Sequence, residues 1–357
     1  SVNELYYLEE VDSTNTWAKA NLDKFGPVGA VYTTSQTAGR GRRGHTWINA
    51  SGQALYYTVV LKTELAQPES LPLFASMAVA DALEQRYGIQ CQIKWPNDLL
   101  LNGKKIVGIL CEGMPDHHAI VCGIGINLAQ PQSYFDAMAL PHGTSLALQG
   151  IAVDPAADAA ALAEQIVARL TIGIEASGRH VHLSRHDLEA LFGAGYQLNR
   201  VKELSQPGQF ACAERVTLEG PKGSIPNVVI LGPERPESQV EISLTDGVAL
   251  GITPPVRLSG DIAGTPGITL RHGDRVLRLE RGLVAAKRHI HMTPADAARF
   301  GVADKQTVRL RCFTARPAVL EDVEVRVSPK FSTVVHIDYD EANGCGFKKG
   351  DRGLILK

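Results

Sequence analysis

Two copies of one pentapeptide, RHVHL beginning at Arg179 and RHIHM beginning at Arg288, carry the residues of this sequence that are best suited to metal chemistry. In an extended strand, residues i and i+2 point to the same face with Cα atoms about 6.5 Å apart, so both imidazoles of an HxH pair can bind one metal ion. A single HxH pair is more often a polar pair on a strand surface. Here the copies stand 109 residues apart, as do Asp187 and Asp296 behind them. This duplication favours a shared or paired metal site, and neutral imidazole suits zinc.

Further side chains that could bind a metal lie in two other segments. The segment VVHIDYDEAN offers His336, with Asp338 and Asp340 expected on the same strand face, and the segment SQVEIS offers Glu241. Each of these residues alone is more often structural or solvated. Together they supply nitrogen and oxygen ligands in surplus of the two HxH pairs, which are His180 with His182 and His289 with His291.

The second half of the chain resembles the phosphate propanoyltransferases of the propanediol-utilisation type, the PduL family. The resemblance covers residues 171–357 and rests on RHVHLS, LSQPGQF, GPKG, ILGPER, QVEIS, PVRLSGD, GTPGI, AKRHIHM and HIDYDEAN, which occur in this order. It implies that the region interconverts a propanoyl- or acetyl-CoA plus phosphate with an acyl phosphate plus coenzyme A (CoA). It also implies a mainly β fold of two barrels and two zinc ions. One zinc ion would be held by His180, His182 and Glu241, and the other by His289, His291 and His336.

The same resemblance implies that Arg235 grips the phosphate as a catalytic residue, while Arg257 and Ser259 could meet the phosphates of CoA. Arg235 suits this role, because its guanidinium is a planar fork that matches phosphate oxygens and stays charged. A zinc ion beside the CoA sulfur would lower the thiol pKa, and a metal or its bound water can polarise the acyl carbonyl. The alternative is that zinc is structural and that Arg235 is a surface arginine in a proline-rich turn.

A glycine-rich basic loop, TAGRGRRGHTW from Thr37 to Trp47, is the most informative stretch of the first half. Its glycines formally satisfy GxGxxG, but a dinucleotide-binding turn must open a helix, whereas this loop runs into turn residues and a β-branched, aromatic segment. No GK followed by Ser or Thr occurs, which excludes a Walker loop. Two interpretations remain: a basic loop that closes over an anion, and a loop that is merely solvated.

The first half resembles the catalytic domain of biotin protein ligases. The motifs VDSTNTWAK, TAGRGRRGHTW, KWPNDLLLNGKKIVGIL and GIGINL carry this resemblance. It implies that biotin and ATP, with magnesium, give biotinyl-AMP and pyrophosphate, and that a lysine of a biotin carboxyl carrier protein then takes the biotinyl group. The biotin site would comprise Ser13, Thr14, Gln36, Gly39, Arg40, Arg42 and Lys105, and the ATP site Lys94, Asn97, Asp98 and Asn127. Lys105 and Arg42 would be catalytic, because positive groups must neutralise the charge that develops when a carboxylate attacks a phosphate.

Two departures from the ligase pattern bear on this interpretation. The chain starts just before the ligase-like region, so we expect no DNA-binding helix-turn-helix and no repressor role. The small barrel that usually follows the ligase catalytic domain is missing, and the phosphotransacylase region stands in its place. We predict a bifunctional enzyme, with one alternative: a phosphotransacylase whose first half binds or senses biotin without turnover.

Simple patterns predict the elements that must position these residues. Asp154 followed by proline and by apolar residues at helical spacing predicts a helix over residues 154–170. LPLFASMAVADALEQRYG predicts a second helix, and Asn102-Gly103 between two β-rich runs predicts a hairpin. Beyond the first helix, short β-rich runs alternate with Gly/Pro turns. We therefore predict a multidomain chain: an α+β ligase-like domain, residues 1–170, and a mainly β phosphotransacylase domain, residues 171–357.

The composition is typical of a globular, cytoplasmic protein. The chain has 357 residues, of which 44% are hydrophobic, and its net charge is −2. A charge this close to zero gives no reason to expect a nucleic-acid or membrane partner. The six cysteines form no CxxC pair, so we expect reduced thiols in the cytoplasm. No apolar stretch approaches the roughly 18 residues that span a bilayer. The sequence leaves a homo-oligomer open.

Overall fold

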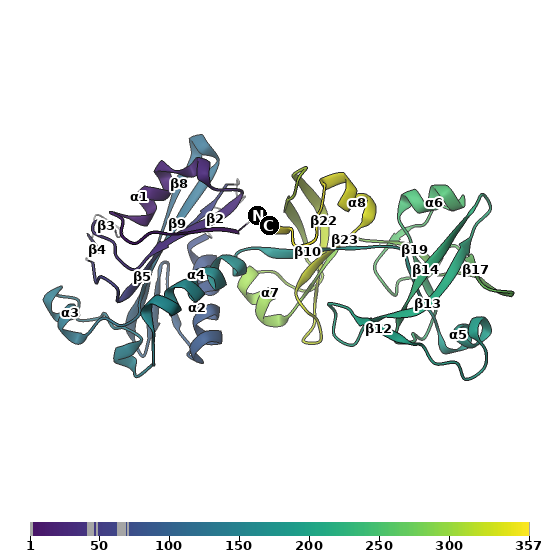
Figure 1. Cartoon of the computed structure of the whole chain (residues 1–357), viewed down its shortest axis with the longest axis horizontal. Coiled ribbons are helices and arrows are strands. Elements are labelled where there is room, and N and C mark those ends of the chain that lie inside the picture. Colours follow the sequence, from purple (N-terminus) through teal and green to yellow (C-terminus); the bar gives the residue numbers. More distant parts are fainter. Residues whose placement is uncertain (1–2, 41–45, 48, 63–68, 70, 357) are drawn as a thin grey trace. The chain divides into compact units, whose positions relative to one another are not determined.

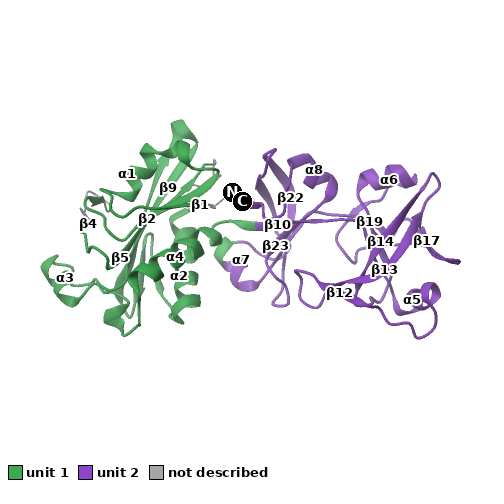
Figure 2. Cartoon of the chain, viewed as in Figure 1, with its two compact units in different colours: residues 1–172, 299–301, 356–357 green, residues 173–298, 302–355 purple. Residues whose placement is uncertain are grey.

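The chain folds into two compact units (Figure 2). The computed structural model describes residues 3–40, 46–47, 49–62, 69 and 71–356. The first unit comprises residues 1–172 with 299–301 and 356–357, and the second comprises residues 173–298 and 302–355.

A seven-stranded sheet forms the centre of the first unit (Figure 1). Its order is β1-β2-β5-β9-β8-β7-β6, and its pairs are antiparallel except for β1 with β2. These strands are β1 (Asn3–Tyr7), β2 (Val28–Thr33), β5 (Ala54–Leu61), β6 (Gln92–Lys94), β7 (Asp98–Leu101), β8 (Lys104–Met114) and β9 (Ala119–Asn127). The helices are α1 (Thr14–Ala20), α2 (Leu71–Tyr87), α3 (Gln132–Ala137) and α4 (Pro155–Arg169). A separate ladder pairs β3 (Gly39–Arg40) with β4 (Thr46–Trp47).

Helices cover both faces of this sheet, which explains why β5 is buried along its whole length. Successive residues of a strand point to opposite faces. Tyr57 donates its hydroxyl to Ala163 O in α4 at 2.6 Å, whereas Thr58 donates its hydroxyl to Asn15 Oδ1 in α1 at 2.6 Å. The sheet therefore lies between α1 on one face and α4 on the other, and α2 packs beside α4.

Local sequence signals set the ends of these elements. Asp154 caps α4 by accepting a hydrogen bond from Ala157 N, and a proline occupies the first turn. Asn102 and Gly103 have positive φ angles of 50° and 78°, the combination that a two-residue hairpin favours, and they join β7 to β8. The predicted hairpin and both predicted helices are confirmed.

The second unit contains a closed six-stranded barrel and a nine-stranded sheet (Figure 1). The barrel order is β10-β23-β20-β22-β21-β24, formed by β10 (Ile172–Ser177), β20 (His289–Met292), β21 (Thr307–Phe313), β22 (Ala318–Val327), β23 (Val334–Asp338) and β24 (Arg352–Leu356). The sheet order is β16-β19-β15-β11-β14-β13-β17-β18, with β12 paired to β13. Its strands are β11 (His180–His182), β12 (Arg200–Glu203), β13 (Phe210–Glu219), β14 (Ser224–Gly232), β15 (Gln239–Glu241), β16 (Val256–Arg257), β17 (Ile268–His272), β18 (Arg275–Leu279) and β19 (Leu283–Ala286). The helices are α5 (Arg185–Phe192), α6 (Leu244–Leu250), α7 (Pro294–Phe300) and α8 (Tyr339–Cys345).

The barrel and the sheet repeat one arrangement of strands. β11 lies between β14, to which it is parallel, and β15, to which it is antiparallel. β20 lies in the same way between the parallel β22 and the antiparallel β23. Helices follow at equivalent places, α5 and α7 after the central strands and α6 and α8 after the antiparallel ones. The two pentapeptides therefore occupy equivalent strands.

Strand alternation decides which side chains enter each core. Val181 and Val240 are fully buried in the core of the nine-stranded sheet, and Ile290 and Val335 are fully buried in the barrel strands. The neighbours of these residues along each strand therefore point to the opposite face, and they include both HxH pairs, Glu241 and His336. The predicted fold class is confirmed: the first region is α+β, and the second is mainly β, with one barrel closed and the other part an open sheet. In the described part of the chain, no helix has the length and apolar character to span a membrane.

Candidate functional site

The first triad consists of His180, His182 and Glu241. Antiparallel pairing of β11 with β15 places Glu241 directly opposite His180. His180 Nε2 lies 3.1 Å from His182 Nε2 and 3.2 Å from Glu241 Oε2, and all three residues are buried. Three potential ligand atoms therefore converge on one point.

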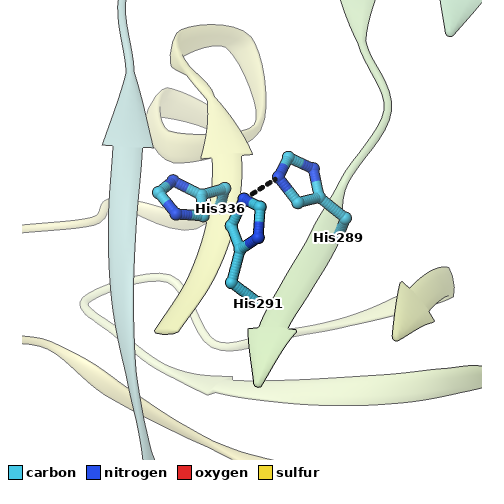
Figure 3. Close-up of side chains that lie close together, drawn as sticks. All are labelled: His289, His291 and His336. Atoms are coloured by element: carbon cyan, nitrogen blue, oxygen red, sulfur yellow. Dashed lines mark hydrogen bonds between the residues drawn. The ribbon is translucent and has the colours of Figure 1, made fainter. Parts of the chain in front are cut away.

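The second triad consists of His289, His291 and His336 (Figure 3). Antiparallel pairing of β20 with β23 places His336 directly opposite His289, as in the first triad. The Nε2 atoms of His289 and His291 lie 3.1 Å apart, and the ring of His336 is centred 4.9 Å from that of His291. His336 thus takes the position that Glu241 takes in the other copy.

The geometry of both triads fits a metal ion. Two nitrogen ligands at about 2.05 Å from a tetrahedral zinc ion lie about 3.3 Å apart, close to the separation seen within each HxH pair. The Nδ1 atoms of His180 and His289 lie 2.9 Å and 2.7 Å from the carbonyl oxygens of Gly178 and Lys287. A carbonyl only accepts, so each Nδ1 carries the proton and each Nε2 lone pair is free for a metal. His336 Nε2 is buried without a hydrogen-bond partner among the described residues, as expected of a metal ligand.

Burial favours the neutral form of three of these rings. It lowers the pKa of His182 well below the usual 6.5, that of His291 to about 3 and that of His336 to about 2. The charges of neighbouring histidines lower these pKa values further. A neutral imidazole is the form that binds a metal.

The two triads lie close enough to influence each other. Burial is the main cause of the low pKa of His336, and His180 of the other triad contributes to it. Burial also lowers the pKa of His289, while Glu241 of the other triad opposes that shift. We call the six residues of both triads the paired centre.

The arginine that opens each pentapeptide is tied to the helix that follows the third ligand. Arg179 forms an ion pair with Asp246, with Nη2 and Oδ1 3.1 Å apart, and Arg288 forms one with Glu341. Asp246 and Glu341 are the third helical residues in the capping boxes of α6 and α8. Each ion pair therefore connects the HxH strand to the helix that follows the third ligand. This contact explains why an arginine precedes each HxH pair.

A second tie occurs in both copies. Ser238 Oγ donates to Asp187 Oδ2 at 2.5 Å, and Thr333 Oγ1 donates to Asp296 Oδ2. Each aspartate lies in the helix after an HxH pair, and each hydroxyl residue lies three positions before a third ligand. Ser238 and Thr333 stand 95 residues apart, as Glu241 and His336 do. The repeat therefore continues past the HxH pairs, with a spacing of 95 residues in place of 109.

Arg235 lies beside the first triad. Its backbone N–H donates to the carbonyl of Leu183, directly after the HxH strand, and its Nη1 donates to Ser259 Oγ at 2.8 Å. Burial lowers the pKa of Arg235, and the negative charge of Glu241 raises it. The structure therefore brings Arg235, Ser259 and the first triad together.

Arg257, the other residue expected at the CoA phosphates, is engaged by its own turn. Its Nη1 lies 3.2 Å from Asp261 Oδ1 and donates to Ala263 O at 3.1 Å. This arrangement stabilises the loop that carries Ser259.

The acidic residues expected on one strand face with His336 do not all lie there. β23 ends at Asp338, which caps α8 by accepting a bond from Glu341 N at 2.8 Å. Asp340 already belongs to the helix and accepts a bond from Thr245 N in α6 at 3.0 Å. The expectation of a continuous strand is wrong, because the capping box starts a helix at this point.

Two residues near the paired centre are not among the site residues predicted from the sequence. Gln239 on β15 donates to Glu241 Oε1 at 2.8 Å. Arg326 on β22 lies directly opposite His291, so both side chains point to the same face, and among the described residues its guanidinium forms no hydrogen bond or ion pair. Its charge lowers the pKa of His291, after burial and His289. Only strand register reveals this neighbourhood.

In the first unit, a cavity of about 630 Å³ borders the seven-stranded sheet. Seven of the residues predicted for biotin and ATP line it: Ser13, Thr14, Gln36, Asn97, Asp98, Lys105 and Asn127. Gln36 Oε1 accepts a bond from Thr14 N at 2.9 Å, and Lys105 Nζ lies 3.0 Å from Asp98 Oδ1. A volume of this size is typical of small-molecule sites, which span about 300–1,000 Å³.

Glycines form part of the wall of this cavity. Gly123 and Gly125 lie on the same face of β9, and Gly108 of β8 lies opposite Gly125. A Cβ atom on Gly123 would lie 2.5 Å from Asn15 Oδ1, the atom that accepts the hydroxyl of Thr58. The motif GIGINL therefore supplies a wall of backbone against which buried polar groups and a ligand can pack.

The remaining predicted residues of this half are placed as follows. Arg42 and the side chain of Arg40 lie outside the described residues. Gly39 belongs to β3, whose partner is β4, so the described part of the glycine-rich loop forms a ladder and does not open a helix. The described lining of the cavity includes neither Gly39 nor Lys94.

Comparison with known proteins assigns each half of the chain. The family model of phosphate propanoyltransferase matches residues 173–348, and that of the biotin/lipoate A/B protein ligase family matches residues 7–127. A phosphate propanoyltransferase from Enterococcus faecalis is 58% identical over 202 residues, which are 55% of this chain and 96% of that protein. Another from Listeria monocytogenes is 59% identical over 186 residues, which are 52% of this chain and 87% of that protein.

Solved structures also align with the chain. A biotin protein ligase from Aquifex aeolicus is 28% identical, with 46% of this chain and 68% of that chain covered, at a TM-score of 0.37. Because this score is below 0.5, the assignment of the first half rests on the family model.

Proposed function

We propose that this chain, which belongs to the phosphate propanoyltransferase family, transfers an acyl group between CoA and phosphate at its paired centre. In this reaction a phosphate oxygen attacks the carbonyl carbon of an acyl-CoA, the carbon–sulfur bond breaks, and an acyl phosphate and CoA leave. We propose propanoyl or acetyl as the acyl group. The observation that carries the proposal is the pair of triads beside Arg235, in the part of the chain that matches the family.

The donor atoms of the paired centre fit two zinc ions. Five imidazoles and one carboxylate are ligands that zinc accepts. His336 Nε2, which has no hydrogen-bond partner among the described residues, lies in a triad that an ion would complete. Bound zinc would act as a Lewis acid that lowers the pKa of the CoA thiol and polarises the acyl carbonyl. The chain itself fixes the ligands, through the arginine and aspartate ties of each copy.

Two guanidinium groups would bind the phosphate. Arg235 is oriented by Ser259, and its planar fork can engage two phosphate oxygens. Arg326 comes from the other copy, and after burial its charge contributes to the lowered pKa of Arg235. Like charges in one partly buried region disfavour each other until an anion neutralises them. The arrangement therefore stabilises a phosphate and the negative charge that develops during transfer.

Phosphorolysis of acyl-CoA by the purified chain tests this proposal. We expect propanoyl-CoA or acetyl-CoA, assayed beside butyryl-CoA, to release free CoA thiol only when phosphate is present. The activity should be lost on chelation and return with zinc. Thiol release that needs no phosphate, or activity that survives complete metal removal, would contradict the proposal.

For the first unit we propose biotin ligation in two steps. Biotin and ATP, with magnesium, would form biotinyl-AMP and pyrophosphate, and a carrier-protein lysine would then displace AMP. The cavity supports this, because Ser13, Thr14 and Gln36 lie in its wall together with Asn97, Asp98 and Lys105. Lys105 would neutralise charge between the biotin carboxylate and the α-phosphate. The basic loop would exclude water from the mixed anhydride.

Biotin-dependent exchange of pyrophosphate into ATP tests this second activity. We expect exchange in the wild-type chain, a loss of about 10²-fold or more in Lys105→Ala, and none of that loss in Lys104→Ala, whose side chain is exposed next to it. Full exchange in Lys105→Ala would remove that residue from catalysis. Biotin binding without any exchange would favour a sensing module.

A further inference from the structure

Gln239 is a buried polar residue that opens the segment QVEIS but is not among the site residues predicted from the sequence. The residue is 2% exposed, and it lies two positions before Glu241 on β15, so both side chains point to the same face. A buried amide is costly unless its donors and acceptor are bonded. The partners of Gln239 therefore show why the chain keeps an amide here.

The amide of Gln239 is fixed in one orientation. Its Oε1 accepts a hydrogen bond from Gly260 N at 2.8 Å, and a backbone N–H can only donate. The opposite atom must therefore be Nε2, which donates to Glu241 Oε1 at 2.8 Å. Glu241 Oε2, the other oxygen, lies 3.2 Å from His180 Nε2, on the side of the metal ligands. Gln239 thus holds one carboxylate oxygen so that the other faces the triad.

The same amide reaches the phosphate-binding arginine through one hydroxyl. Gln239 Nε2 lies 3.3 Å from Ser259 Oγ, and Arg235 Nη1 donates to that Oγ at 2.8 Å. Gly260, which orients the amide, is the next residue in the chain. One amide therefore connects the metal-binding carboxylate to the serine that orients Arg235.

The other copy of the repeat has no counterpart of this chain of hydrogen bonds. Val334 takes the place of Gln239, because each residue lies two positions before the third ligand. The third residue of that triad is His336, an imidazole that would bind a metal through one nitrogen and has no second oxygen to be held. The amide is thus present in the copy where the third ligand is a carboxylate and where Arg235 lies.

We propose that Gln239 is a positioning residue that orients Glu241 for the first metal ion and, through Ser259, Arg235 for phosphate. The part of this proposal that concerns phosphate rests on the proposed acyl transfer. Metal binding and phosphate binding in the first copy would then depend on one amide. Partners of metal ligands typically change metal affinity or activity by about 10–100-fold when they are removed.

Three variants of the full-length chain test this proposal. Gln239→Met keeps an unbranched side chain of similar length without a donor, and Ser259→Ala removes only the branch to Arg235. Gln306→Leu is the matched control, because its amide bonds to the Ala303 turn. Zinc affinity is measured by competition with a chelating dye, and the affinity for inorganic phosphate is measured by calorimetry on the zinc-loaded protein.

We expect Gln239→Met to lower the affinity for one of the two zinc ions by about 10–100-fold and to weaken phosphate binding as well. Ser259→Ala should weaken phosphate binding alone, and Gln306→Leu neither. Zinc affinities in Gln239→Met within twofold of wild type would overturn the proposal, as would unchanged phosphate binding in both Gln239→Met and Ser259→Ala. If the wild-type chain binds zinc and phosphate but transfers no acyl group, the proposed function fails while these binding results still judge Gln239.

Discussion

The two copies of the HxH unit agree in how they hold their ligands and differ in which third ligand they use. Each copy has an arginine tied to a capping-box acid and an aspartate tied to a hydroxyl residue before the third ligand. The first copy adds a carboxylate, Glu241, with its amide partner. The second adds an imidazole, His336, with a valine at the amide's position.

The comparison separates residues that both copies need to build a triad from residues that set the chemistry of one triad. The ties recur because both copies must bring a third ligand opposite the first histidine of an HxH pair. The third ligands differ, and this changes the charge of the site: a Glu with two His carries one more negative charge than three neutral His. A site with the carboxylate is less positive, and it is also the site beside the half-buried Arg235. If the proposed function holds, phosphate binding should depend more on the first copy, which carries Arg235, than on the second copy, which carries Arg326.

The largest effect should come from removing the arginine of the first copy. We expect Arg235→Ala to lower the rate of acyl transfer by about 10²–10³-fold, because an oriented cation that stabilises transition-state charge is lost. The protein should remain folded with its full metal content. Arg281→Ala, which breaks a surface pair with Glu237, serves as the control. An active Arg235→Ala enzyme would make the two copies equal in function and would favour structural zinc.

A smaller effect should follow from removing the corresponding charge of the second copy. Arg326 is partly exposed and has no hydrogen-bond partner among the described residues, so its guanidinium is less firmly oriented than that of Arg235. We expect Arg326→Ala to raise the KM for phosphate about tenfold with a smaller change in kcat, the equivalent of one charge-assisted hydrogen bond. A loss as large as that of Arg235→Ala would show that both copies share the phosphate equally.

The smallest effects should come from the arginine ties. We expect Arg179→Ala and Arg288→Ala each to lower the affinity of one zinc ion by about tenfold. The Arg288 side chain is 32% exposed and that of Arg179 is 43% exposed, so solvent screens the Arg288–Glu341 ion pair less. Arg288→Ala should therefore lower zinc affinity more than Arg179→Ala does. Chelator competition on each variant measures this. Equal loss of both ions in either variant would mean that the copies are not independent.

The HxH pairs could be predicted from the sequence because period-two spacing is local to a strand. The duplicated spacing also indicated a structural repeat. Glu241 and His336, in contrast, are only candidate ligands from their residue type, and the family resemblance assigns each to its HxH pair. Their position opposite the first histidine depends on pairing between distant strands. Arg326 could not be predicted for the same reason. Gln239 stands at period-two spacing from Glu241, but its other partners, Ser259 and Gly260, lie 20 and 21 residues further along the chain. Asp340 is misplaced because a capping box overrides the strand pattern.

The first half shows the same division between local and long-range information. Asn102-Gly103 and the Asp154 cap predicted a turn and a helix end correctly, because both signals act over a few residues. The contact between Asn15 and Gly123 could not be predicted, because it joins segments from α1 and β9 that meet only in the folded sheet.

The number of metal ions bound per chain tests the central claim most directly, in the wild type and in His180→Ala and His289→Ala. Mass spectrometry of the purified, folded proteins gives this ratio. Two triads that each hold one ion predict two zinc ions in the wild type and one in each variant. A wild-type ratio below two after zinc loading, or a ratio that neither substitution changes, would contradict the account.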